Sequence, residues 1–258
     1  MRGIFVILSA ILAQAAAAQT IETLKYTVPP DLGYLNVSSK NNYYAGGAGA
    51  YFELVREAFD GSDARLQFSA SETYNDAVQG AMAGNFDFAV GVAFDEHLLG
   101  LLDFVPTPIF DDSLDVVINS GGKAIKGLDR EILQLLGSRR AVALAGLYLP
   151  ILAASSPEYF QTADEAVDAV LSGTEILIIP SSLMSGYLDK NAGAERIKTL
   201  KINRHSKSRA LFFIAVNRES KSKQVSHGGS AKGLFEFMAE RLSAMESDGR
   251  LKKIMLRK

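Results

Sequence analysis

Side chains with catalytic or metal-binding potential are sparse in this sequence. The three histidines, at positions 97, 205 and 227, lie too far apart to form a local metal motif. Because the chain contains no cysteine, disulfides, thiolate metal sites and a cysteine nucleophile are excluded. No H-E-x-x-H, G-x-S-x-G or G-x-x-x-x-G-K-[ST] pattern is present, and the adjacent acids Asp111 and Asp112 alone do not indicate acid–base catalysis. The sequence therefore predicts a non-catalytic protein that needs no metal ion or other cofactor.

Hydrogen-bonding chemistry is concentrated at one strand tip, in the stretch EILIIPSSLMSGYL. The apolar run from Ile176 to Ile179 predicts a buried strand, which ends on Pro180 and is followed by Ser181 and Ser182. In α/β sheets, ligands bind beyond the carboxyl ends of the strands, so these hydroxyls are candidates for contact with a ligand. A second interpretation stays open, in which the two serines form a polar turn or cap the next helix.

The strand tip belongs to a unit that occurs twice in the chain. DAVQGAMAGNFDFAVGV, from Asp76 to Val92, aligns without a gap with EAVDAVLSGTEILIIPS, from Glu165 to Ser181. Each unit is typical of an amphipathic helix, a glycine suited to a left-handed helix end, and a buried strand, and the glycines are Gly84 and Gly173. Two such units predict two lobes. Their strand ends, one at Gly91 and the other at the serine tip, are expected to face a shared cleft.

Around the repeated units, short apolar strands alternate with amphipathic helices. Strands are expected at residues 24–28, 65–69, 140–146 and 210–220, and helices at 51–59, from about residue 150, and after residue 230. The segment SLDVVINSGGKAIKG predicts a strand that crosses from the first lobe to the second, and the terminal helices are expected to return to the first lobe. This alternation predicts an α/β fold in which each lobe is a mixed, mostly parallel sheet flanked by helices.

The N-terminus has the pattern of a secretory signal peptide. MRGIFVILSAILAQAAAAQT contains Arg2, an apolar stretch from Ile4 to Leu12, and small residues before Gln19, which predicts cleavage after residue 18 and a periplasmic protein. A retained membrane anchor is disfavoured because this stretch is shorter than the ~20 residues of a spanning helix, and no later stretch is long enough. With a formal net charge of −2, the chain has no basic excess that would predict a nucleic-acid partner.

Several segments, in their order and spacing, resemble the extracytoplasmic solute-binding proteins of the amino-acid type, known as family 3. GAYFELVREAF is similar to that family's glycine–aromatic helix start, AVQGAMAGNFDFAVG to its helix–glycine–strand unit, LDFVPTPIF to its Asp-Phe-Ser-x-Pro-aromatic segment, and MESDGRLKKI to its ending. The resemblance implies a two-lobed periplasmic-binding clamshell of type II that closes on a small solute by a hinge motion. With the signal peptide at residues 1–18, lobe 1 is expected at 19–112 and 208–258, and lobe 2 at 113–207.

The resemblance also implies three polar contacts to an amino acid, and this chain departs from each. The arginine that binds the ligand carboxylate corresponds to Leu98 or Leu99 here. The family's Gly-Thr or Gly-Ser pair corresponds to Gly146 and Leu147, so the backbone amides remain but the hydroxyl is lost. The aspartate that pairs with the ligand ammonium corresponds to Ser181. Because each charged hydrogen bond contributes about 1.5–3 kcal/mol, free amino acids are expected to bind several orders of magnitude more weakly.

Aromatic and basic side chains are the remaining candidates. The resemblance aligns Tyr34 and Tyr74 with ligand-stacking positions, although both also suit packing within the fold. His97 suits either an anion contact or a helix end, and the basic run at residues 201–209 suits either a solvated loop or an anion-binding rim. The candidate ligand-binding residues are Tyr34, Tyr74, Gly91, Val92, His97, Leu98, Leu99, Gly146, Leu147, Tyr148, Ser181 and Ser182.

Two functions follow from the resemblance and from these departures. The first is an exported solute-binding protein that closes its cleft on a small solute, other than a standard free amino acid, for an ABC-type importer. The second is an accessory or sensor protein for a periplasmic enzyme or receptor, with an altered or vestigial ligand site. The expected partners are a small solute and either an ABC permease or another periplasmic protein. The protein is expected to be a monomer.

Overall fold

The computed structural model of the chain describes residues 22–29, 49–119, 136, 139–152, 155–173 and 175–255. The predicted signal peptide, at residues 1–18, and the candidate ligand residue Tyr34 lie outside this described part. None of the helices within the described ranges is long and apolar enough to cross a membrane.

The fold is built on one mixed sheet with the strand order β2-β1-β3-β9-β5-β8-β6-β7, and β4 also pairs with β9. The strands are β1 (Thr23–Thr27), β2 (Arg65–Phe68), β3 (Phe88–Ala93), β4 (Leu102–Phe104), β5 (Phe110–Asn119), β6 (Ala141–Leu144), β7 (Glu158–Phe160), β8 (Ile176–Pro180) and β9 (Leu200–Asn217). Strands β1, β2 and β3 pair in parallel at one end, and β6, β7 and β8 pair in parallel at the other. Between them, β5 and β9 run antiparallel to each other and to their outer neighbours. The predicted α/β class with a mixed sheet is therefore confirmed.

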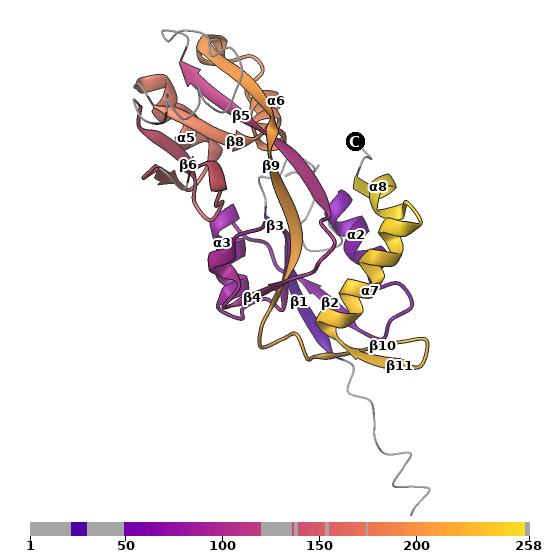
Figure 1. Cartoon of the computed structure of the whole chain (residues 1–258). Coiled ribbons are helices and arrows are strands. Elements are labelled where there is room, and N and C mark those ends of the chain that lie inside the picture. The colour runs from indigo at the N-terminus through magenta and orange to yellow at the C-terminus, as the bar shows by residue number, and fades with distance from the viewer. Residues whose placement is uncertain are drawn as a thin grey trace, which may run out of the picture.

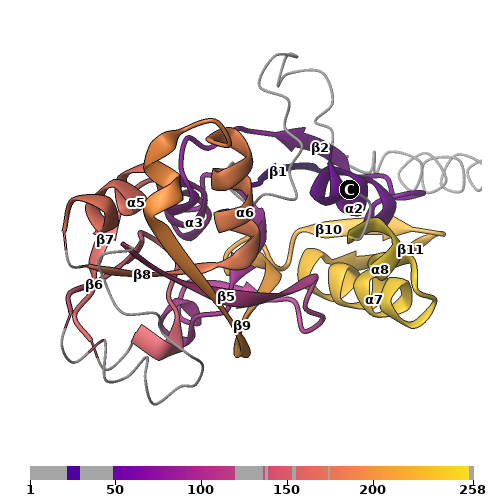
Figure 2. The same cartoon turned by 90° about the horizontal axis from the view of Figure 1, so that it is seen from above.

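Helices cover both parallel groups of strands. The α-helices are α2 (Ala50–Ala58), α3 (Tyr74–Met82), α5 (Ala163–Ser172), α6 (Ser181–Lys190), α7 (Leu234–Ser247) and α8 (Arg250–Met255). The 3-10 helices are η1 (Glu96–Leu98), η2 (Pro150–Leu152) and η3 (Glu195–Thr199), and β10 (Gln224–His227) pairs with β11 (Ser230–Gly233) in a hairpin. Figures 1 and 2 show α2, α3, α7 and α8 around the β1–β3 group, and α5 and α6 at the far end of β5 and β9.

Both copies of the repeated unit are present, because α3 leads into β3 and α5 leads into β8. The two helices begin in the same way. Thr73 before α3 and Thr162 before α5 each accept the backbone amide three residues later, and the acid at that later position bonds back to the threonine amide. This capping box satisfies two otherwise unpaired amides at each helix start.

The two glycines that follow these helices differ in conformation. Gly84 has a φ of +76°, as predicted for a left-handed helix end. Gly173 is extended, with a φ of −141°, so the prediction of a left-handed end is wrong for α5. A physical reason lies in the last turn, where the Ser172 hydroxyl donates to the Ala169 carbonyl at 3.1 Å and satisfies it without a left-handed turn.

Two other segments differ from the sequence-based expectation. Strand β9 begins at Leu200, so the basic run at 201–209 lies in a strand and not in a loop. Charged residues have low strand propensity, but residues 201–205 and Arg209 pair with β5, with a register shift between them, and this pairing decides the structure here. Instead of a longer helix from residue 150, the described residues form η2 and then β7, because Pro157 does not continue a helix.

One continuous buried core extends through both parallel groups of strands. It contains residues of α2, α3, β1 and β3 together with residues of α5, α6, β6 and β8. Phe88, which is fully buried, stacks on Tyr26 with a centroid distance of 5.3 Å and on Phe59 at 5.8 Å. Arg241 of α7 donates to the Ala58 carbonyl at 2.8 Å, so the terminal helices pack against α2.

Candidate functional site

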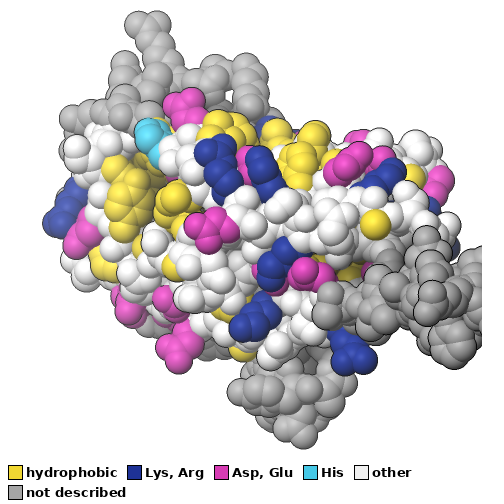
Figure 3. Space-filling model, turned by 90° about the horizontal axis from the view of Figure 1, so that it is seen from below, with side chains coloured by type: hydrophobic (Ala, Val, Ile, Leu, Met, Phe, Trp, Pro, Cys, Tyr) yellow, Lys and Arg dark blue, Asp and Glu magenta, His cyan; other side chains and the backbone are white. Residues whose placement is uncertain are grey.

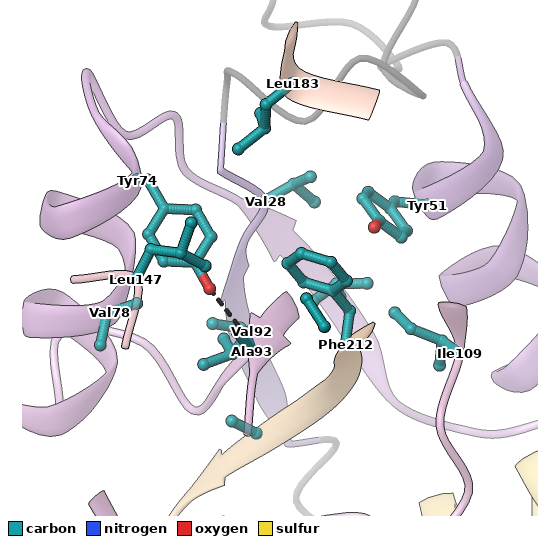
Figure 4. Close-up of a cluster of buried hydrophobic side chains, with 14 of the residues drawn as sticks. Val28, Tyr51, Tyr74, Val78, Val92, Ala93, Ile109, Leu147, Leu183 and Phe212 are labelled. Atoms are coloured by element: carbon teal, nitrogen blue, oxygen red, sulfur yellow. Dashed lines mark hydrogen bonds between the residues drawn. The ribbon is translucent and has the colours of Figure 1, made fainter. Parts of the chain in front are cut away.

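Tyr74 is the first residue of α3 and lies buried at the end of β3. Its side chain is 1% exposed, and its hydroxyl accepts a 2.7 Å hydrogen bond from the Ala93 amide, which Figure 4 shows as a dashed line. Burial raises the pKa of the Tyr74 hydroxyl far above its ordinary value, the bond from Ala93 opposes the rise, and the Asp95 charge adds to it. The neutral hydroxyl therefore holds α3 on β3. Contact between Tyr74 and a ligand stays a prediction.

A bulge at Gly91 shapes the end of β3. The register of pairing with β9 shifts between Val90 and Val92. Gly91 has a φ of +83°, which glycine adopts at little cost, so the strand can bend here. Val92 is fully buried, and Figure 4 shows it close to Ala93 at this strand end. The candidates Gly91 and Val92 therefore form the end of β3, next to Ala93, whose amide donates to the Tyr74 hydroxyl.

The loop after β6 contacts the start of α3. Gly146 has a φ of +78°, and a Cβ atom on it would lie 2.9 Å from the Asn75 Cα and 3.3 Å from the Tyr74 Cδ1. The next residue, Leu147, is 1% exposed and belongs to the same buried cluster as Tyr74 and Val78. Figure 4 shows the three side chains beside one another. The structure thus brings together candidates from the two repeated halves of the chain.

His97, Leu98 and Leu99 lie in the turn that follows β3. The Asp95 carboxylate accepts the His97 amide and contacts the His97 Nδ1, both at 2.9 Å. Leu98 is partly buried and Leu99 is 43% exposed. The Tyr148 ring meets the His97 ring edge-on, with 5.1 Å between the centroids. Leu98 and Leu99, one of which corresponds to the arginine of the similar family, are apolar. The neighbouring His97 ring contacts Asp95 and Tyr148.

Ser181 and Ser182 begin α6 and are buried against β5. The Ser181 hydroxyl donates to the Asp115 Oδ1 at 2.7 Å and lies 2.9 Å from the Ser113 hydroxyl. The Ser182 amide donates to the Asp112 Oδ2 at 2.8 Å. Because no side chain of the N-cap residue caps α6, the carboxylate of β5 takes that role and also complements the helix dipole. Contact of these serines with a ligand stays a prediction.

The buried carboxylates Asp112 and Asp115 are functional candidates; the sequence pattern had discounted Asp112 as one of two adjacent acids and had not singled out Asp115. They are 6% and 2% exposed, and the Arg204 Nε lies 3.4 Å from the Asp115 Oδ1. Burial raises the pKa of Asp112, hydrogen bonds from Ser182 partly oppose it, and the Asp115 charge adds to the rise. The sequence does contain a signal for Asp115. It lies within the apolar run LDVVI, which predicts a buried strand, and an acid is seldom buried without a partner.

Large hydrophobic side chains are exposed near the turn that follows β3. Phe94, Leu99 and Leu101 are between 43% and 47% exposed. Leu211 of β9 is 41% exposed, and its carbonyl accepts the Phe94 amide at 3.0 Å. Figure 3 shows hydrophobic side chains exposed among charged ones on the lower face of the molecule.

The described residues supply few groups for other chemistry. No group of three or more histidine, aspartate or glutamate side chains within the described ranges is placed to hold a metal ion. A surface groove of about 580 Å³ lies beside α3 and the loop before it, with Glu72, Gln79 and Asn85 among its lining residues. None of the candidate ligand residues lines this groove.

Comparisons with known proteins find similarity in structure. No protein-family model and no curated protein matches the chain. A histidine kinase sensor domain with similarity to periplasmic binding proteins is 16% identical, with 91% of this chain and 94% of that chain covered and a TM-score of 0.68. An amino-acid ABC transporter substrate-binding protein from Streptococcus pneumoniae, bound to L-arginine, is 17% identical, with 96% and 95% covered and a TM-score of 0.64. An ancestral arginine-binding protein bound to glutamine is 18% identical, with 90% and 95% covered and a TM-score of 0.63.

At these identities the comparisons show the fold. The structural neighbours include amino-acid ABC transporter substrate-binding proteins, which is the type of protein that the sequence resembles. The predicted fold, an α/β architecture of the periplasmic-binding kind with a mixed sheet flanked by helices, is therefore confirmed. The neighbours also include a sensor domain, so the same architecture is found in more than one functional setting.

Proposed function

We propose that this protein is an exported, non-catalytic binding protein that acts as an accessory or sensor component for a periplasmic partner protein and does not capture free amino acids. The observation that carries the proposal is that polar groups expected in the cleft bond to the protein itself. The Tyr74 hydroxyl accepts the amide of Ala93, and the Ser181 hydroxyl donates to Asp115. An amino acid needs charged partners for its carboxylate and its ammonium, and these hydroxyls cannot replace them.

Two lobes joined by a hinge are part of this proposal. Residues 19–112 and 208–258 form lobe 1, and residues 113–207 form lobe 2, after removal of the signal peptide at 1–18. Both boundaries fall within β5 and β9, the strands between the two parallel groups, and this position supports a hinge there. The mature protein is proposed to be a periplasmic monomer without a cofactor.

Recognition of a protein partner is supported by the exposed hydrophobic side chains of Phe94, Leu99 and Leu101, which lie next to the loop contact with lobe 2. The structural similarity to a histidine kinase sensor domain gives further support, because it pairs this fold with a signalling role in that protein.

A second candidate function is that of a receptor that delivers a small solute, other than a standard free amino acid, to an ABC permease. This candidate is favoured by the structural neighbours described as ABC transporter substrate-binding proteins. Neighbouring genes for a permease and an ATPase would support it, whereas a single gene beside a periplasmic dehydrogenase or kinase would support the accessory or sensor function.

A thermal-shift screen of the signal-free protein against the standard amino acids tests the proposal. The melting temperature should not change, because the three positions that correspond to the family's polar ligand contacts are Leu98 or Leu99, Leu147 and Ser181, none of which carries a charge. By contrast, a ligand present at 100 times its dissociation constant stabilises a protein by about 2.7 kcal/mol, which the screen detects easily. An arginine-binding protein of this fold is the positive control. A clear shift with any amino acid, confirmed by calorimetry at micromolar affinity, would contradict the proposal.

A further inference from the structure

The contact between the loop after β6 and the start of α3 joins the two proposed lobes. Gly146 and Leu147 belong to lobe 2, whereas Tyr74 and Asn75 belong to lobe 1. At this contact the two backbones approach so closely that a Cβ atom on Gly146 would lie 2.9 Å from the Asn75 Cα and 3.2 Å from the Asn75 Oδ1. Carbon atoms that are not bonded do not approach to this distance, so the contact leaves no room for a solute between Gly146 and Asn75.

Gly146 allows the approach for two independent reasons. Its φ of +78° lies in the left-handed region, where residues with a Cβ atom are strained. It also lacks the Cβ atom that would collide with the backbone of α3. Gly249 provides a useful comparison, because it has the same φ of +78° but nothing lies within 4 Å of its Cβ position.

Leu147 lies where the sequence resemblance places a hydroxyl-bearing residue of a ligand site. Its side chain is 1% exposed and is part of the buried cluster that includes Tyr74 and Val78. Figure 4 shows Leu147 beside these two residues, at the strand end where Tyr74 bonds to Ala93. Burial of this apolar side chain stabilises the contact between the lobes, and a solute at this place would have to displace it into water.

We propose that Leu147 takes the place of a solute between the lobes and keeps them closed in the ligand-free protein. The inference rests on the two-lobe arrangement of the proposed function. It adds that the protein binds its partner in the closed, ligand-free state. Lobe closure then needs no ligand, so the closed surface around His97 and Tyr148 is presented at all times. A receptor for an importer differs from this, because its closed form has to report a bound solute.

Distance measurements between two spin labels test the proposal. Because the chain has no cysteine, Gln79→Cys on α3 and Ser172→Cys at the end of α5 give two unique labelling sites, both exposed. The ligand-free protein should give one short, narrow distance distribution that a mixture of amino acids does not change. Leu147→Ala and Gly146→Ala should each shift the distribution to longer and broader distances, because they weaken or block the contact between the lobes.

Two matched controls separate opening from a general loss of stability. Gly249→Ala introduces the same backbone strain as Gly146→Ala but meets no neighbouring atom. Leu242→Ala truncates a fully buried leucine of α7, away from the loop contact. Both should leave the distance distribution unchanged. If Gly146→Ala does not fold, Leu147→Ala still tests the contact.

A long or broad distribution in the unsubstituted protein would overturn the proposal, as would an unchanged distribution in Leu147→Ala. These failures differ from a failure of the proposed function. An amino acid that raises the melting temperature contradicts the proposed function, whereas an open cleft that binds no amino acid contradicts only the closure by Leu147.

Discussion

Tyr74 offers a single atom whose removal isolates one hydrogen bond of the candidate site. Tyr74→Phe keeps the ring but leaves the Ala93 amide, which is buried, without its acceptor. Because an unsatisfied buried donor costs about 1–3 kcal/mol, the free energy of unfolding should fall by about that amount. Urea unfolding followed by circular dichroism measures the change.

Tyr159→Phe is the matched control, because this ring is 48% exposed and water can solvate its hydroxyl. Its effect on the free energy of unfolding should stay within about 0.5 kcal/mol. If Tyr74→Phe were as stable as the unsubstituted protein, the Tyr74 hydroxyl would have no structural role and would be free to serve a ligand.

The types of residue at the candidate site were predictable from the sequence, but their partners were not. The position of Ser181 after a buried strand followed from the apolar run before it. Its hydrogen bond to Asp115 joins residues 66 positions apart and depends on how β5 pairs with β8. The close approach of Gly146 to Asn75 is likewise a long-range contact that local sequence patterns do not encode.

Among the elements, the strands depend on two buried carboxylates that are expected to respond to pH in opposite ways. Asp87 directly precedes β3 and links it to neighbouring segments. Its carboxylate accepts the Lys25 amide of β1 at 2.7 Å and the Ser220 hydroxyl at 2.6 Å, and it forms an ion pair with Lys223 at 2.8 Å. Burial alone would raise the pKa of Asp87, but the bonds from Lys223, Ser220 and Lys25 outweigh it and hold the pKa below 3.8. This carboxylate stabilises the fold above about pH 3.8, and the contribution is lost as the pH falls through the lowered pKa.

Asp112 on β5 accepts the Ser182 amide of α6 and has the opposite shift, because burial raises its pKa above 3.8. Between pH 3.8 and the raised pKa, the folded protein binds this proton more tightly than the unfolded chain does. The stability that Asp112 contributes is therefore greatest at low pH and is lost as the pH rises through the raised pKa. Asp112→Asn should remove this dependence, since the amide oxygen can still accept the bond from Ser182.

Urea unfolding of Asp87→Asn and Asp112→Asn between about pH 3 and about pH 7 distinguishes the contributions of the two carboxylates to stability. The stability advantage of the unsubstituted protein over Asp87→Asn should grow as the pH rises. Its advantage over Asp112→Asn should shrink, or turn into a disadvantage, over the same range. A common direction for both variants would show that at least one carboxylate has the opposite pKa shift.

The sequence predicted elements well where one pattern dominated locally. Both repeated helices were predicted, and each start carries a local signal, because Thr73 and Thr162 each precede an acid at the capping-box spacing. The prediction failed where a neighbouring strand decides the structure. Residues 201–209 carry charges typical of a loop, but residues 201–205 and Arg209 pair with β5, so the run is part of β9.

At the scale of the whole molecule, β5, β9 and the shared core tie the two ends of the sheet together. Domains within one chain usually move relative to each other unless their interface is large and apolar. Here the strand order is continuous from β2 to β7, and the buried cluster contains residues from both ends. The molecule should therefore unfold as one unit even without a ligand.

Two single-tryptophan variants test this expectation, because the chain has no tryptophan of its own. Phe68→Trp in β2 and Phe160→Trp in β7 replace partly buried aromatic residues near opposite edges of the sheet. Their thermal transitions should coincide with each other and with the loss of circular dichroism, since the two ends share one core. The calorimetric enthalpy should also equal the van't Hoff enthalpy. The contradicting result is a lower thermal midpoint for the tryptophan signal of Phe160→Trp than for that of Phe68→Trp, in two variants of equal overall stability. The β6–β8 end would then unfold separately, and the contact around Leu147 would not couple the two ends.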